Sequence, residues 1–118
     1  VIAMDRITWS AAENWPGCTY TQKMFGRRFT LATGADGMAA AIDGREIFRC
    51  SAGAQVTTDM EGEILSVTGI GERESPLKLT AQGRTYRASI APNQVLGIQG
   101  DRLHQVGRVP FDYPYIRP

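Results

Sequence analysis

Apolar and polar side chains alternate most regularly between residues 77 and 90. Leu77, Leu79 and Ala81 alternate with polar residues, Gly83 marks a turn, and the same alternation resumes beyond it. A period of two is typical of a strand with one face on a core and the other in water. The stretch therefore predicts two antiparallel strands joined by a tight turn, which restricts the chain to folds that contain a half-buried sheet.

Turn residues divide most of the remaining chain into short segments of strand-forming residues. Asp-Gly pairs, which favour tight hairpins, stand at residues 36–37 and 43–44. Strands are predicted near residues 28–33, 38–42, 45–50, 54–58, 64–68, 77–82, 85–90, 95–98 and 103–106. Residues 7–9 are expected to be extended, and strand-forming residues also begin at Cys18.

The predicted strand at 45–50 has two faces that the sequence distinguishes. Phe48 and Cys50 share one face, which is expected to be buried. Strict alternation places Ile47 on the opposite face with Arg45 and Arg49.

About eight short strands at regular spacing predict an all-β domain, either a small antiparallel β-barrel or a β-sandwich. The length of 118 residues is that of one domain, which we expect to span residues 1–108. Ser10 and Glu13 have the spacing of a capping box, but Pro16 and Gly17 follow at once. At most one short N-terminal helical turn is therefore expected.

Residues 109–118 differ from the rest of the chain because three prolines stand four residues apart. Proline at that spacing excludes a helix and a central strand, which predicts an extended Pro-rich tail. Such a tail either packs over its own domain or contacts a partner. The side chains that we predict to bind another protein are Phe111, Tyr113, Tyr115, Ile116 and Arg117.

The net charge of +1 gives the chain no global attraction to nucleic acid or to an acidic membrane surface. Basic residues gather at 23–49 and acidic residues at 59–74, so each region is charged although the total is close to neutral. We therefore expect no nucleic-acid partner. No apolar run approaches the ~18 residues of a membrane-spanning helix, so no membrane span is expected.

Two cysteines, Cys18 and Cys50, permit one disulfide, with two separate buried thiols as the alternative. The chain begins at Val1 rather than Met, which we interpret as a mature, processed or excised form. Together these features favour a secreted or periplasmic location, because disulfides persist in oxidising compartments. A virion component and a cytoplasmic protein remain open.

The sequence contains one histidine, His104, with Asp101 three residues before it. A hydrolase would need a nucleophile, a base and a group that orients the base, and the G-x-S-x-G sequence is absent. Phosphate-binding glycine loops and Cys/His clusters are also absent from the sequence, so no cofactor is expected.

Asp59, Glu61 and Glu63 alternate in a manner that could gather oxygen ligands for a hard cation. Ile70 stands where a calcium-binding loop would need its bidentate acid. Charged residues at the end of a hairpin also protect a strand edge from aggregation. We therefore predict no metal site.

The sequence favours a non-enzyme without deciding the question. It contains few candidate catalytic residues and many residues of the types that contact other proteins. Aromatic and arginine residues are enriched at protein interfaces. The leading hypothesis is a non-catalytic protein-binding or assembly domain, such as an accessory or structural subunit or a secreted inhibitor-like module. Its partner would be another protein or a second copy in a homo-oligomer.

Two further hypotheses remain open. A small-ligand-binding β-barrel would enclose its ligand among aromatic side chains. The residues predicted to line that pocket are Trp9, Trp15, Tyr20 and Tyr86. The third hypothesis is a small hydrolase that uses His104.

Overall fold

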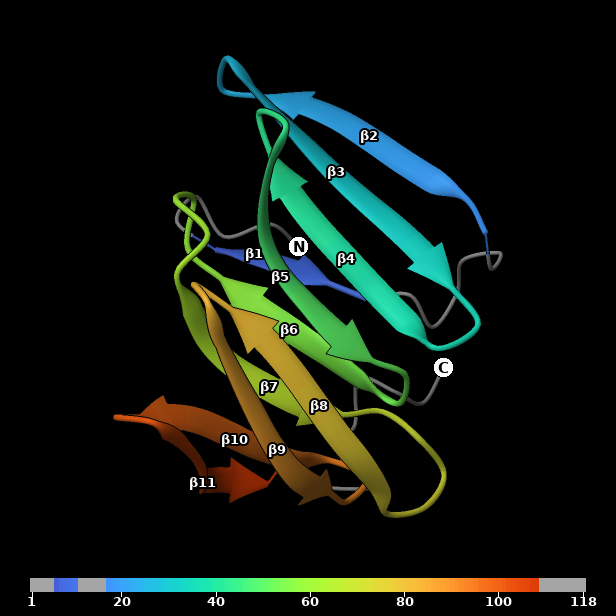
Figure 1. The fold of residues 1–118 in the computed structure, drawn as a ribbon, viewed down its shortest axis with the longest axis vertical. Helices are drawn as coiled ribbons and strands as arrows, with labels where there is room; N and C mark the ends of the chain where they lie inside the picture. The colour runs from blue at the N-terminus through green and yellow to red at the C-terminus, as the bar shows by residue number, and fades with distance from the viewer. Residues whose placement is uncertain (1–5, 11–16, 109–118) are drawn as a thin grey trace, which may run out of the picture.

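A computed structural model describes residues 6–10 and 17–108 (Figure 1). In these residues eleven strands form two antiparallel sheets, and there is no helix. The strands are β1 (Ile7–Trp9), β2 (Thr19–Met24), β3 (Arg27–Gly34), β4 (Gly37–Ile42), β5 (Arg45–Ser51), β6 (Ala54–Thr58), β7 (Ile64–Gly69), β8 (Ser75–Ala81), β9 (Arg84–Ile90), β10 (Gln94–Gln99) and β11 (Arg102–Arg108).

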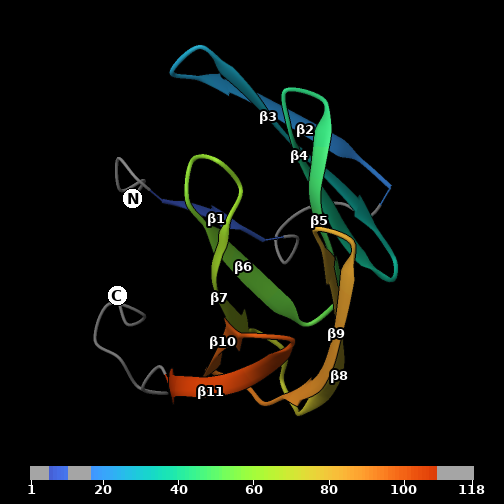
Figure 2. The ribbon, with the colours of Figure 1, turned by 60° about the vertical axis from the view of Figure 1, so that its left-hand side comes forward.

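The two sheets face each other as a sandwich (Figures 1 and 2). The five-stranded sheet has the order β1-β6-β7-β10-β11, and the six-stranded sheet has the order β2-β3-β4-β5-β8-β9. On one side β9 lies against β11, which brings the two sheets together. On the other side the edge strands are β1 and β2, and Figure 2 shows them well separated. The sheets do not close into a barrel, so of the two predicted architectures the sandwich describes this fold.

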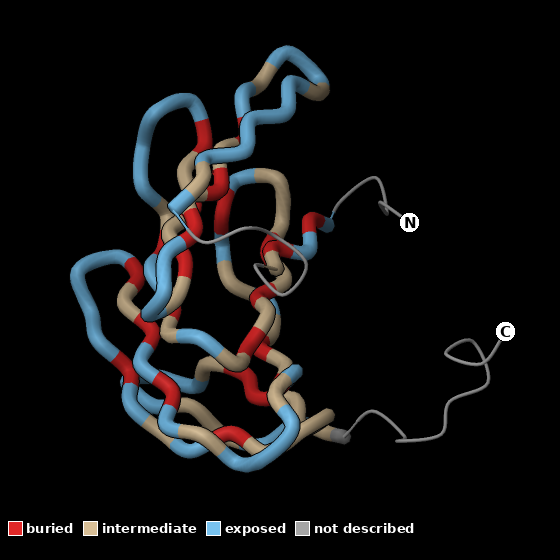
Figure 3. Tube along the Cα trace, turned by 90° about the vertical axis from the view of Figure 1, so that its right-hand side faces the viewer, coloured by how far each residue is buried: buried red, intermediate tan, exposed pale blue. Residues whose placement is uncertain are grey.

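Inward-facing side chains from both sheets form one core. The most completely buried large side chains are Phe48, Leu79, Ile90, Val56, Val67 and Thr58. Figure 3 shows the buried residues between the sheets and the exposed residues on the turns and outer positions. The strands supply this pattern because alternate residues point to opposite faces.

The alternation that opened the sequence analysis is confirmed. Leu77, Leu79 and Ala81 are all buried on β8, and each has an exposed or half-buried neighbour. Gln82 and Gly83 both have left-handed backbone angles, φ 52° and 76°, which suit the tight turn between β8 and β9. The predicted turn at Asp43 has the same geometry, with φ 52° followed by 82° at the next glycine.

The prediction of about eight strands was too low, since the described residues contain eleven. β1 has only three residues, which is too short to establish a period. β2 is exposed at five of its six positions, so its side chains follow no alternation of apolar and polar. The predicted helical turn and the predicted tail fall mainly in residues 11–16 and 109–118, outside the described residues.

The strict alternation expected for β5 is wrong at Ile47. A β-bulge shifts the pairing of β4 with β5, so that Ala40 pairs with Phe48 while Ala41 pairs with Glu46. The extra residue at a bulge re-aims its side chain. Ile47 therefore packs against the core instead of lying in solvent with Arg49.

The predicted disulfide between Cys18 and Cys50 is also wrong, because both cysteines are free. The Thr33 N–H donates a hydrogen bond to the Cys18 carbonyl, so Cys18 lies opposite Thr33. Thr33 in turn pairs with Met38, and Met38 pairs with Cys50. The two cysteines are thus three strand spacings apart, about 14 Å. A disulfide requires Cα atoms about 4.4–6.8 Å apart. Both residues lie in one cross-strand row, but two strands separate them.

Within the described part of the chain, no helix has the length and apolar character needed to cross a membrane.

Candidate binding site at the open side of the sandwich

A groove of about 780 Å³ lies where the two sheets diverge, between β1 and β2. Its lining combines apolar and polar side chains from both sheets. The residues that define it are Trp9, Tyr20, Gln22, Met24, Phe29 and Leu31.

Trp9 lies in the part of this groove nearest the core. Its indole is 4% exposed, and its Nε1 donates a hydrogen bond of 2.8 Å to Thr58 Oγ1. Its ring centroid lies 6.2 Å from that of Phe29 and 6.0 Å from that of Phe48, in tilted and edge-on geometries that favour aromatic contact. Trp9 therefore joins the short β1 to both sheets.

β2 forms the outer wall of the groove. Tyr20 pairs with Leu31 and Gln22 pairs with Phe29, so these side chains share the inward face of the six-stranded sheet. Yet Tyr20 is 36% exposed and Gln22 is exposed, because β2 extends beyond the cover that the five-stranded sheet provides. An inward-facing row that remains in contact with solvent is the main opening in this fold.

The backbone of β2 also has an available edge. Thr33 N donates to Cys18 O on the β2 side, whereas Arg28 O accepts from Asp43 N on the β4 side. Backbone groups in an antiparallel strand alternate in direction. Counting from these two residues, the N–H and C=O groups of Thr21 and Lys23 point away from β3, toward the edge of the sheet.

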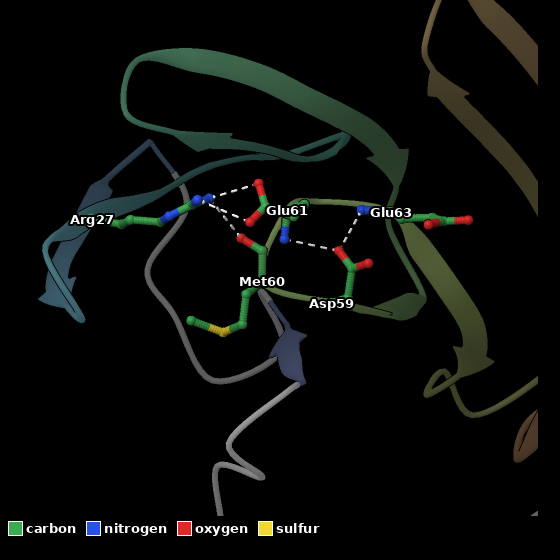
Figure 4. Close-up of polar contacts among 5 residues, drawn as sticks. All are labelled: Arg27, Asp59, Met60, Glu61 and Glu63. Carbon is green, nitrogen blue, oxygen red and sulfur yellow. Dashed lines mark hydrogen bonds and ion pairs between the residues drawn. The ribbon is translucent and has the colours of Figure 1, made fainter.

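Next to Met24, which lines the groove and pairs with Arg27, an ion pair joins the two sheets (Figure 4). Arg27 Nη1 donates to Glu61 Oε2 at 2.9 Å and to the Met60 carbonyl at 3.2 Å, while Arg27 Nη2 lies 2.9 Å from Glu61 Oε1. This bidentate pair raises the pKa of Arg27 above its ordinary value, first through the hydrogen bond to Glu61. It connects the β2–β3 turn to the β6–β7 loop.

The loop that presents Glu61 is organised by a carboxylate. Asp59 Oδ1 accepts hydrogen bonds of 2.9 Å from the backbone N–H groups of Glu61 and Glu63. Figure 4 shows the Asp59 carboxylate held by this loop and the Glu61 carboxylate directed at Arg27. Among the described residues, no three His, Cys, Asp or Glu side chains gather in a group that could hold a metal.

The structure brings together only some of the residues that we predicted for a ligand pocket. Trp9 and Tyr20 line the same groove. Tyr86 lies elsewhere, at a small cavity of about 150 Å³ with Ala81 and Ile98. Trp15 and the predicted protein-binding residues Phe111, Tyr113, Tyr115, Ile116 and Arg117 lie outside the described residues.

His104 is remote from this groove. It pairs with Gly97 on the β10–β11 hairpin, at the opposite edge of the five-stranded sheet from β1. Asp101 lies 4.0 Å from the Arg102 guanidinium. Within the described residues His104 makes no hydrogen bond or ion pair, so its surroundings give no support to a catalytic role.

Sequence reasoning did not predict that Gln22 lines the groove or that Arg27 forms an ion pair with the other sheet. Nothing local indicates that Arg27 reaches a loop 34 residues later in the chain. The exposed, polar sequence of β2 could have indicated an edge strand, since a charged side chain such as Lys23 is typical of strands at the edge of a sheet.

Comparison with models of protein families, with curated proteins and with solved structures found no match to this chain.

Proposed function

We propose that this chain is a non-catalytic domain that binds an extended segment of another protein at the open side of the sandwich. The observation that carries the proposal is the position of β2. It is an edge strand that directs backbone groups outward and lies beside a groove of about 780 Å³. A segment that pairs with β2 would extend the six-stranded sheet by one strand, a common way of recognising peptides.

The groove supports a segment with small or apolar residues at alternate positions. Side chains of an added strand point alternately inward and outward. The inward ones would cover Trp9 and Tyr20, and the outward ones would lie beside Thr21 and Lys23. Backbone pairing would supply affinity, and the groove would supply specificity.

The substitution Thr21→Pro tests this arrangement. Proline removes the N–H that we place at the free edge and leaves the hydrogen bonds between β2 and β3 intact. The matched control is Thr21→Val, which keeps the N–H and the β-branched shape. A library of random extended peptides is first selected on the wild-type chain, and the selected peptides are then measured on both variants.

The proposal predicts that selected peptides lose at least about tenfold in affinity for Thr21→Pro and keep their affinity for Thr21→Val. Failure to select any peptide, or equal binding to both variants, would contradict it. Turnover of a generic substrate panel that His104→Ala abolishes would contradict the non-catalytic part.

The tail remains part of this proposal as a second contact. Its aromatic residues are of the kind enriched at protein interfaces. Truncation after residue 108 would weaken binding of a partner that contacts both surfaces. Unchanged affinity for an intact partner would remove the tail from the binding surface.

A small apolar ligand is the second candidate, because Trp9 and Tyr20 line one groove of suitable size. A ligand there would change tryptophan fluorescence, and Tyr20→Ala would abolish that change. A ligand-induced change that persists in Tyr20→Ala would place the ligand elsewhere.

A further inference from the structure

The outer face of the six-stranded sheet carries five exposed cationic side chains. Each stands between inward-facing neighbours on its strand, so all five point away from the core. They are Lys23 on β2, Arg28 on β3, Arg49 on β5, Lys78 on β8 and Arg87 on β9. Glu46, which lies 2.8 Å from Arg49 Nε, is the acidic residue on the strands of this face. The strand order and the pairing registers place the five cations along a diagonal of the sheet, whose strands Figure 1 shows.

Four of these cations form two like-charged pairs. Lys23 is directly opposite Arg28, and Lys78 is directly opposite Arg87. Like charges at directly opposed positions repel each other and destabilise a sheet. Within the described residues, none of the four side chains forms an ion pair. An anion bound between the members of either pair would relieve this repulsion.

Small residues make a hollow between the cations. It has a volume of about 490 Å³ and lies over β3, β4, β5 and β8. Ala32, Ala39 and Gly37 line its floor, with Arg49 and Lys78 at its border. The outward residues of β6 and β7 on the other sheet are uncharged by contrast, namely Gln55, Thr57, Ser66 and Thr68. The central strands β6 and β7 of the other sheet therefore lack the outward charge that this face carries.

We infer that this outer face binds an extended acidic segment of a partner protein. The cationic diagonal crosses five strand spacings and about three side-chain rows, roughly 31 Å, which is the length of about nine extended residues. Among the described residues, the strands of this face carry no outward-facing aromatic side chain on which a nucleic acid base could stack, and the exposed Phe25 lies in the β2–β3 turn rather than on the strands. Asp36 and Asp43 in the bordering turns would repel a long polyanion that runs past the ends of the strands. A short acidic polypeptide needs no stacking surface, and it ends before it reaches the repelling carboxylates of the turns.

The test uses a fluorescent peptide of about nine glutamate residues, the length of the diagonal, measured by anisotropy at about 25 mM and 150 mM salt. The variant K78T/R87T removes one like-charged pair. Threonine is chosen because Thr80 and Thr85, the next pair on the same face of the sheet, already face each other with their hydroxyls 3.2 Å apart. The matched control R73T/R102T removes the same charge from positions outside the six-stranded sheet. A DNA duplex of similar charge is measured in parallel.

We expect K78T/R87T to lose about tenfold or more in affinity for the peptide, while R73T/R102T changes it less than about twofold. Binding to the wild-type chain is expected to weaken at the higher salt concentration. Equal losses in both variants, absence of binding at low salt, or tighter binding to the duplex than to the peptide would overturn the inference. Because Thr21 lies outside the substituted pair, this result and the peptide-selection result can fail independently.

Discussion

The β8–β9 side and the β1–β2 side of this sandwich differ in how completely the two sheets cover each other. At β8 and β9 the sheets meet, and Leu79 and Ile90 are almost completely buried. At β1 and β2 they diverge, and β2 is exposed along most of its length. The difference indicates a division of labour. We expect the covered side to supply most of the free energy of unfolding, and we propose that the uncovered side presents the surface for a partner.

The largest expected effect is at the covered side. Leu79→Ala would remove a side chain with 0% exposure and leave a cavity in the core. We expect a loss of about 2–5 kcal/mol in the free energy of unfolding, measured by denaturant titration. The control Leu65→Ala, at a 43% exposed position, and Gln22→Ala on β2 should each change it by less than about 0.5 kcal/mol. Similar losses at all three positions would contradict the comparison.

The two cysteines offer a second comparison between the sides. Burial raises the pKa of the Cys50 thiol from its ordinary value of 9.0 to about 12. The folded state therefore keeps its proton where the unfolded state has lost it, so stability falls as pH rises from about 9 toward about 12. The slope from this group is about 1.4 kcal/mol per pH unit.

The measurement is the free energy of unfolding against pH for the wild type and for Cys50→Ala. Subtracting the two curves removes the titration of tyrosines and lysines common to both. A difference that does not change with pH above 9 would contradict the burial of this thiol. At neutral pH, alkylation should modify Cys18, which is partly exposed, and spare Cys50 until the chain unfolds.

The attachment of β1 gives an intermediate effect. Trp9→Phe removes the donor of the 2.8 Å hydrogen bond to Thr58 Oγ1. We expect a cost of about 1–3 kcal/mol, because a buried hydroxyl loses a partner. Combining it with Thr58→Val in a double-mutant cycle isolates the bond. Strictly additive losses would show that Trp9 stabilises β1 through packing alone.

The smallest effect on stability is expected at the Arg27–Glu61 ion pair that joins the two sheets. Arg27→Gln removes the bidentate contact with Glu61, and the exposed position of the pair limits its effect on global unfolding. Its expected consequence is local, namely faster amide hydrogen exchange in the β2–β3 turn. Wild-type exchange should approach that of the variant at high salt. Unchanged exchange in the variant would show that the pair does not restrain the hairpin.

The sequence was sufficient for the elements whose side chains alternate. β6 was predicted with its observed bounds, and the inward faces of β8 and β9 were predicted residue by residue. Local spacing determines such strands, because burial of one face imposes a period of two. The same reasoning failed at Ile47, where a bulge interrupts the period.

Pairing between distant strands was not predictable from local patterns. β5 pairs with β8, and two strands of the other sheet intervene in the sequence. The disulfide prediction failed for this reason, since the cysteine count contains no information about the strands that separate Cys18 from Cys50. Of the candidate site, the sequence indicated Trp9 and Tyr20 as aromatic candidates but not the edge that brings them to one groove.

Amide hydrogen exchange at Thr21 and Lys23, with and without a selected peptide, tests the central claim most directly. We predict rapid exchange in the free chain, because their N–H groups point to the edge of the sheet, and strong protection in the complex. The amides of β8 and β9 should be protected in both states. Peptide binding that leaves Thr21 and Lys23 unprotected, or protects a different surface instead, would contradict recognition at the β2 edge.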